Sequence, residues 1–168
     1  MIPIVCIVGK SHSGKTTLME KLIPELKERG FKIGTIKHDT HGFEIDREGK
    51  DSYRHKKAGA SFVLISSPEK IALIKDVEKE YTLDELKEKF IEGVDIVLAE
   101  GFKRSSYPKI EIFNKDLHKE LLCTEEDNLI ALVSEKKFDL NVPVFSLNEI
   151  SLLADFIIMK FLDLSKIG

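Results

Sequence analysis

The sequence has little cysteine, and its two cysteines, Cys6 and Cys123, stand far apart without forming a Cys-x-x-Cys pair. Neither a disulfide framework nor a thiolate zinc site is expected, and this usage favours a reducing, cytoplasmic compartment. Proline is also scarce, at 5 of 168 residues, and no segment is of low complexity. A long disordered region is therefore excluded.

The chain also lacks an excess of basic charge and lacks a membrane-type segment. A net charge of -3 argues against a protein that coats nucleic acid through a broad basic face. The apolar run over residues 2–8 has no basic lead, and the apolar carboxy-terminal stretch carries Asp155, Lys160 and Asp163. Neither a signal peptide nor a membrane span is expected.

Alternating apolar segments predict an α/β fold. Residues 2–8 are almost continuously apolar, as in a strand buried on both faces of a parallel sheet. Residues 16–29 have helical apolar spacing, Gly30 ends this helix, and residues 31–37 form a second strand. Further strands are expected at 61–66, 70–75, 94–99, 109–113, 129–133 and 144–147, and further helices at 51–58, 82–92 and 149–162. We expect one domain over residues 1–168, a three-layer sandwich around a mostly parallel sheet.

Two helix starts can also be predicted. Thr82 followed by Glu85 has the spacing of a capping box. Asp51 stands where it could cap the short helix over residues 51–58.

A phosphate-binding loop follows the first strand. Its sequence fits the pattern Gly-x-x-x-x-Gly-Lys-Thr and lies between a buried strand and an amphipathic helix, which is the context that this pattern requires. Glycines let backbone amides converge on phosphate oxygens, Lys15 can reach the terminal phosphates, and Thr16 offers a hydroxyl to Mg²⁺. The predicted nucleotide-binding residues are Gly9, Lys10, Ser11, His12, Ser13, Gly14, Lys15, Thr16 and Thr17.

A carboxylate at the end of the strand over residues 94–99 is the expected partner of the metal. Glu100 ends that strand, whereas Asp95 begins it and lies about 16 Å away at about 3.3 Å per residue. Ligands gather at the carboxyl ends of parallel strands. Thr16 and Glu100 are therefore the predicted Mg²⁺ ligands, and Asp95 is expected only to cap its strand.

Four motifs in order resemble those of one family. They are the phosphate loop, Lys37-His38, Gly49-Lys50-Asp51-Ser52 and Glu100-Gly101-Phe102-Lys103, with Ala58-Gly59-Ala60 after the third. Over nearly its whole length the chain resembles the MobB family of molybdopterin-guanine dinucleotide biosynthesis adaptor proteins. The resemblance implies a P-loop NTPase fold, GTP as the nucleotide, a homodimer, and at most a weak GTPase with slow or partner-dependent hydrolysis. It also implies two partners, molybdopterin (or the molybdenum cofactor) and the guanylyltransferase that joins GMP to it.

The chain departs from the family pattern in the loop before Gly49, where residues 46–48 lack the proline that members often have. Lys10 raises a separate question. It falls where related dimeric ATPases place a lysine that reaches the nucleotide of the partner subunit. The alternative is a solvated lysine that is favourable near phosphate through its charge.

Residues after the second strand are expected at the same edge as the phosphate loop. Lys37 and His38 are predicted to bind phosphate or pterin. Asp39 or Asp46 could bind Mg²⁺ or orient the attacking water, and the sequence leaves the choice between them open. His38 with His41 makes only a weak metal motif, because a third ligand is missing.

Basic residues follow two of the motifs. Arg54 lies in a basic group on the short helix, and Lys103 follows Glu100-Gly101. Since molybdopterin carries a terminal phosphate, the resemblance suggests that Arg54 and Lys103 bind it. Asn114-Lys115-Asp116 is similar to a guanine-binding Asn-Lys-x-Asp motif, but its aspartate comes one position early. That motif is discounted, and the choice of GTP over ATP rests on the resemblance.

A second hypothesis is a small-molecule kinase or an ATP-dependent ligase on the same fold. A kinase usually has a lid, and no separate arginine-rich lid segment is seen, which favours the adaptor. A metal-inserting GTPase would need a Cys/His cluster near residues 38–49, where only His38 and His41 are available.

Overall fold

A computed structural model describes residues 2–117 and 119–162. The chain divides into two compact units, one made of Met1–His38 with Leu86–Gly168 and the other of Asp39–Glu85. The single domain expected over residues 1–168 stays a prediction. In the described residues no helix is both long and apolar enough to cross a bilayer.

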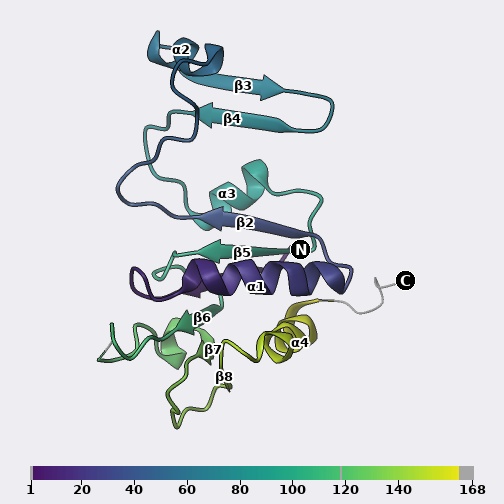
Figure 1. Cartoon of the computed structure of the whole chain (residues 1–168), viewed down its shortest axis with the longest axis vertical. Coiled ribbons are helices and arrows are strands. Elements are labelled where there is room, and N and C mark those ends of the chain that lie inside the picture. Colours follow the sequence, from purple (N-terminus) through teal and green to yellow (C-terminus); the bar gives the residue numbers. More distant parts are fainter. Residues whose placement is uncertain (1, 118, 163–168) are drawn as a thin grey trace. The chain divides into compact units, whose positions relative to one another are not determined.

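The first unit is built on a six-stranded sheet with the strand order β2-β5-β1-β6-β7-β8 (Figure 1). Its strands are β1 (Ile4–Val8), β2 (Ile33–Lys37), β5 (Ile96–Glu100), β6 (Lys109–Ile112), β7 (Leu129–Val133) and β8 (Val144–Phe145). All pairings in this sheet are parallel among the described residues. The predicted α/β class with a mostly parallel sheet is confirmed.

Two helices bury their apolar stripes in the core of this unit. They are α1 (Lys15–Glu28) and α4 (Ile150–Phe161), and a short 3₁₀ helix, η1 (Glu125–Asp127), precedes β7. Leu18, Leu22 and Leu26 follow one another at intervals of four along α1 and are fully buried, with Leu153 and Ile157 of α4 in the same cluster. Burying such a side chain contributes about 1.5–3 kcal/mol. The helical spacing in the sequence thus creates the core that holds α1 in place.

A buried lysine joins the segment before β6 to the segment before β7. Lys109 is 1% exposed, and its Nζ donates hydrogen bonds to the backbone carbonyls of Ser105 at 2.5 Å, Tyr107 at 3.1 Å and Asp127 at 2.6 Å. A buried ammonium is costly unless its three donors are satisfied. Here three carbonyls from two separate chain segments accept them, so Lys109 joins those segments.

The second unit contains α2 (Asp51–Lys57) and an antiparallel hairpin of β3 (Phe62–Ser66) and β4 (Ile71–Lys75), and α3 (Leu83–Phe90) begins within it. The capping box is confirmed. The amide of Glu85 donates to Thr82 Oγ1 at 3.2 Å, and the amide of Thr82 donates to Glu85 Oε2 at 2.9 Å. The predicted cap at Asp51 is wrong. Asp51 is the first helical residue and Lys50 is the N-cap, whose side chain cannot accept an amide.

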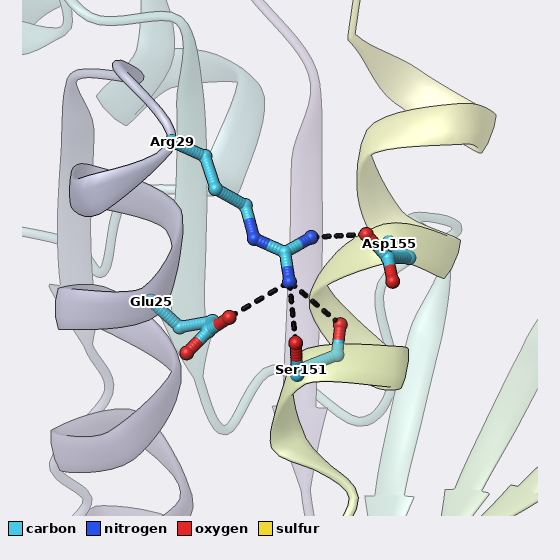
Figure 2. Close-up of polar contacts among 4 residues, drawn as sticks. All are labelled: Glu25, Arg29, Ser151 and Asp155. Carbon is cyan, nitrogen blue, oxygen red and sulfur yellow. Dashed lines mark hydrogen bonds and ion pairs between the residues drawn. The ribbon is translucent and has the colours of Figure 1, made fainter.

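Arg29, just after α1, links that helix to α4 (Figure 2). Its Nη2 donates to Glu25 Oε1 at 2.7 Å, to the Ser151 carbonyl at 3.0 Å and to Ser151 Oγ at 2.7 Å. Its Nη1 donates to Asp155. The Arg29 side chain is 22% exposed, so these contacts are partly screened from water. The planar guanidinium reaches partners on both helices at once, as a lysine could not.

Replacing Arg29 with Ala should lower the free energy of unfolding by about 1 kcal/mol, because partly exposed ion pairs are weak but several act together here. Arg29→Lys should recover only part of this loss. Urea unfolding followed by circular dichroism measures the change. Lys27→Ala, at an exposed position of α1, is the control. Equal losses for Arg29→Ala and Lys27→Ala would show that the link between α1 and α4 does not stabilise the fold.

Candidate functional site

The phosphate loop connects β1 to α1 and is pressed against the end of β6. A Cβ atom on Gly9 would lie 2.5 Å from Ser13 Oγ and 2.8 Å from both the carbonyl oxygen and Cγ2 of Ile112. Gly14, with φ of +105°, is the N-cap of α1, and a Cβ there would lie 3.1 Å from Ile112 Cδ1. Only glycine fits at Gly9, and Gly14 adopts the left-handed backbone that glycine permits.

Lys15 lies over its own loop. Its Nζ donates to the carbonyl oxygens of Gly9 at 3.0 Å and Lys10 at 2.8 Å. Thr16 and Thr17 follow in the first turn of α1 and are exposed. Amides in a first helical turn have no partner within the helix, and the helix dipole favours an anion there. The loop therefore presents a cation, hydroxyls and amide donors together, as phosphate binding requires.

The remaining loop residues differ in exposure. Ser11 and His12 are exposed, whereas Ser13 is 6% exposed and its amide donates to the Lys10 carbonyl at 3.2 Å. His12 has φ of +61°, an uncommon backbone conformation for a residue with a side chain. Such strain is often found where a loop must keep one shape to hold a ligand.

Strand register brings Glu100 and Lys37 to the carboxyl ends of the parallel strands, where the phosphate loop begins. Glu100 pairs with Ile7 of β1 on one side and with Lys37 of β2 on the other. Burial lowers the pKa of Lys15, the charge of Glu100 opposes this by raising that pKa, and the charge of Lys37 lowers it further. The expectation that these residues share one edge is met. Asp95 lies just before β5, at the opposite end of that strand, where its Oδ2 accepts the Lys32 amide at 2.8 Å.

His38 continues from β2 and packs beside the turn that follows β5. Its amide donates to the Glu100 carbonyl at 3.0 Å, and its ring lies 4.8 Å from that of Phe102, centroid to centroid. A Cβ on Gly101 would lie 3.1 Å from the Cβ of His38, so glycine allows this close approach. Phe102 itself has φ of +54°. Two strained turns, at His12 and Phe102, therefore follow adjacent strands.

Two further predicted residues of the first unit have defined surroundings. Lys10 Nζ donates to the carbonyl of Leu117 at 3.2 Å, which connects the phosphate loop to the segment after β6. A role for Lys10 across a dimer stays a prediction. Lys103 is exposed. Burial of the Cys123 thiol and the charge of Glu111 raise the pKa of Cys123 to about 11, and the charge of Lys103 acts in the opposite direction.

Three predicted residues belong to the second unit. Asp39 is exposed and its Oδ1 accepts the His41 amide at 2.8 Å, while Asp46 Oδ1 accepts the Arg47 amide at 2.8 Å. Arg54 is exposed and forms an ion pair with Asp51 at 3.9 Å. Binding by these residues at the phosphate loop stays a prediction.

The donor set fits a metal held mainly by a nucleotide. No group of three or more His, Cys, Asp or Glu side chains that could hold a metal ion occurs within the described residues. Mg²⁺ needs no such cage, because it keeps several waters and is bound through one or two carboxylates together with substrate phosphates. Thr16, in the first turn of α1, and Glu100, at the end of β5, are oxygen donors of this kind.

Sequence reasoning missed one group of residues beside the loop. A cavity of about 240 Å³ is lined by Ser13 and by residues that follow β6 and β7, among them Asn114, Lys115, Asp116, Ser134 and Lys136. The motif at Asn114 was discounted on its spacing alone. Its place directly after a buried strand was the signal that could have identified it, because the carboxyl ends of parallel strands share one edge.

The parallel sheet and the glycine-bounded loop before α1 define a protein of the P-loop NTPase fold. The family model described as "MobB: Molybdopterin guanine dinucleotide synthesis protein B" matches residues 4–135. The chain belongs to the MobB family, and the resemblance seen in the sequence is confirmed.

Similar proteins agree with this membership. The molybdopterin-guanine dinucleotide biosynthesis adapter protein of Haemophilus influenzae is 40% identical over 157 residues, covering 93% of this chain and 88% of the relative. The adapter protein of the same name from Escherichia coli is 35% identical over 165 residues, covering 94% and 93%. The crystal structure of Bacillus subtilis MobB matches with a TM-score of 0.75 at 31% identity, covering 95% of this chain and 98% of that one.

Because Glu100 raises the pKa of Lys15, Glu100→Gln should lower that pKa further. Lys37→Gln should raise it, because it removes a neighbouring positive charge. NMR titration of the Lys15 side chain measures both shifts. Opposite directions in the two variants are expected, and shifts in the same direction would show that the three side chains do not share one electrostatic environment.

Proposed function

We propose that this protein is a GTP-binding adaptor in molybdenum cofactor biosynthesis that assists conversion of molybdopterin to its guanine dinucleotide form. The observation that carries the proposal is that Glu100 and Lys37 lie close enough to Lys15, beside the phosphate loop, for their charges to affect its pKa. The chain that carries this arrangement belongs to the MobB family. Relatives from two bacteria carry the name of an adapter protein in this biosynthesis.

Mg²⁺ accompanies the nucleotide in this proposal. Thr16 would supply a hydroxyl and Glu100 a carboxylate, and the GTP phosphates and water molecules would supply the other ligands. The metal neutralises charge on the phosphates. Lys15 exchanges its hydrogen bonds to the Gly9 and Lys10 carbonyls for bonds to phosphate oxygens, which are stronger acceptors because they are charged.

Hydrolysis by the protein alone is slow. Phosphoryl transfer requires a group that orients the attacking water in addition to groups that hold the phosphates and metal. Asp39 and Asp46 are the acids proposed for that task, and each already accepts a backbone amide within its own loop. A partner that reshapes this loop would raise the rate, and the guanylyltransferase is the partner proposed.

Molybdopterin binds through its terminal phosphate. Lys37, Arg54 and Lys103 are exposed cations, and His38 is half-buried beside Phe102. Exposed cations can bind a phosphate without a large desolvation cost. We place this work in the cytoplasm, where the two free and buried cysteines, Cys6 and Cys123, stay reduced.

A second copy of the chain is the proposed partner for the β3–β4 hairpin. Phe62, Leu64, Ile71 and Leu73 share one face of it, because Leu64 pairs with Leu73 and side chains alternate along each strand. They are 58%, 54%, 70% and 45% exposed. A two-stranded hairpin is marginally stable alone, and a contiguous exposed apolar patch marks an interaction surface. The family resemblance implies a dimer, and this face offers it an apolar interface.

Lys15→Ala should weaken GTP binding by about 2 kcal/mol, because charge-assisted hydrogen bonds to phosphate are lost. It should also abolish the gain in guanine dinucleotide cofactor that the wild-type protein gives to a purified guanylyltransferase at limiting GTP. Calorimetry and the yield of the cofactor measure the two effects.

Glu100→Gln tests the proposed metal ligand and is compared with Lys15→Ala. Its GTP affinity should fall in the presence of Mg²⁺ and stay close to that of the wild type in EDTA, whereas Lys15→Ala should lose affinity in both. A cofactor yield that neither wild type nor Lys15→Ala changes would contradict the adaptor function. It would favour a kinase or a ligase.

Leu64→Lys combined with Leu73→Lys should convert the dimer to a monomer, because burying two lysines in an apolar interface is costly. Sedimentation velocity measures the mass. Met159→Lys is the control, since Met159 of α4 is 78% exposed and belongs to the first unit. A monomeric wild-type protein, or a dimer that survives the double substitution, would contradict this interface.

A further inference from the structure

The cavity beside the phosphate loop has the size of part of a nucleotide. Its volume is about 240 Å³, just below the range of about 300–1,000 Å³ that holds a whole drug-sized ligand. It lies where β6 and β7 end, and residues from the segments after both strands line it. This edge of a parallel sheet is where ligands bind.

The lining suits a flat ring with a polar edge. Ile112, Phe113, Val133 and Leu147 supply apolar surface, and polar residues that follow β6 and β7 supply the rest. A purine base has two apolar faces and a rim of donors and acceptors, so it needs both kinds of surface. Lys136 Nζ lies 5.9 Å from the centroid of the Phe113 ring, which sets charge and aromatic surface side by side.

The cavity and the phosphate loop are physically connected. Ser13 belongs to the loop and also lines the cavity. Lys10, at the start of the loop, donates to the Leu117 carbonyl at 3.2 Å, so the loop also holds the segment that follows β6. A ligand with its phosphates on the loop can therefore extend its other end into the cavity.

A local turn fixes Asp116 at this cavity. The amide of Asp116 donates to Asn114 Oδ1 at 2.9 Å, and both residues line the cavity. Glu135 is the other carboxylate of the lining, but its Oε1 accepts the Leu147 amide at 3.2 Å. Glu135 thus supports the wall of the cavity, and Asp116 is the better acceptor for a ligand.

We propose that this cavity binds the base of the nucleotide and that the Asp116 carboxylate selects guanine. Guanine presents two donors side by side, the N1–H and the amine at C2, and a carboxylate accepts both. Adenine presents an acceptor at N1 and no amine at C2. The lone pair of its N1 would therefore face the carboxylate oxygens, and the two acceptors would repel each other. This assignment rests on the proposed GTP binding and names the residue that distinguishes GTP from ATP.

The test compares GTP, ATP, inosine triphosphate and xanthosine triphosphate by calorimetry with Mg²⁺. Inosine lacks the C2 amine, so the wild-type protein should bind inosine triphosphate about tenfold more weakly than GTP. Xanthine carries a carbonyl at C2. Asp116→Asn offers that carbonyl a donor, so this variant should lose about tenfold or more in GTP affinity and gain affinity for xanthosine triphosphate. Glu135→Gln should keep the wild-type preference.

The outcomes separate this assignment from the proposed function. Wild-type protein that binds neither GTP nor ATP would contradict nucleotide binding itself. Tight GTP binding that Asp116→Asn leaves unchanged would overturn only the role of Asp116, as would equal wild-type affinities for GTP and inosine triphosphate. The latter comparison needs no variant, and a gain for xanthosine triphosphate cannot arise from unfolding.

Discussion

The close approach of Gly9 to Ile112 is the constraint on which the site depends. Any side chain at Gly9 would overlap the Ile112 backbone, so the loop can turn tightly onto the sheet only with glycine there. Ile112 also meets Gly14 and lines the cavity beyond the loop. One residue at the end of β6 thus supports the start of the loop, the start of α1 and the wall of the neighbouring cavity.

Strand register determines which charges meet at this edge. Glu100 stands between Ile7 and Lys37 because β5 pairs in parallel with both β1 and β2. A shift of one residue along β5 would turn its carboxylate to the other face of the sheet. The apolar core that fixes the register therefore also determines which charges surround Lys15.

The sequence was most informative where a local pattern determines structure. The buried strands, the helical spacing of Leu18, Leu22 and Leu26, and the capping box at Thr82 all depend on near neighbours, and all are present. The cavity depends on residues that follow two different strands, and no linear spacing rule describes their approach. Asn114-Lys115-Asp116 was discounted because its aspartate comes one position earlier than in the Asn-Lys-x-Asp motif. That comparison did not consider the strand that precedes these residues. The two compact units reflect contact density, which is not visible in the order of residues.

Lys109 acts as a cation built into the chain. Its ammonium donates to the carbonyls of Ser105, Tyr107 and Asp127, the kind of oxygen ligands that also bind alkali ions. Because this cation is covalently attached, chelators cannot remove it and a change of salt cannot exchange it. These three carbonyls are therefore satisfied without a bound ion. Under the proposed function, this part of the scaffold therefore needs no metal of its own.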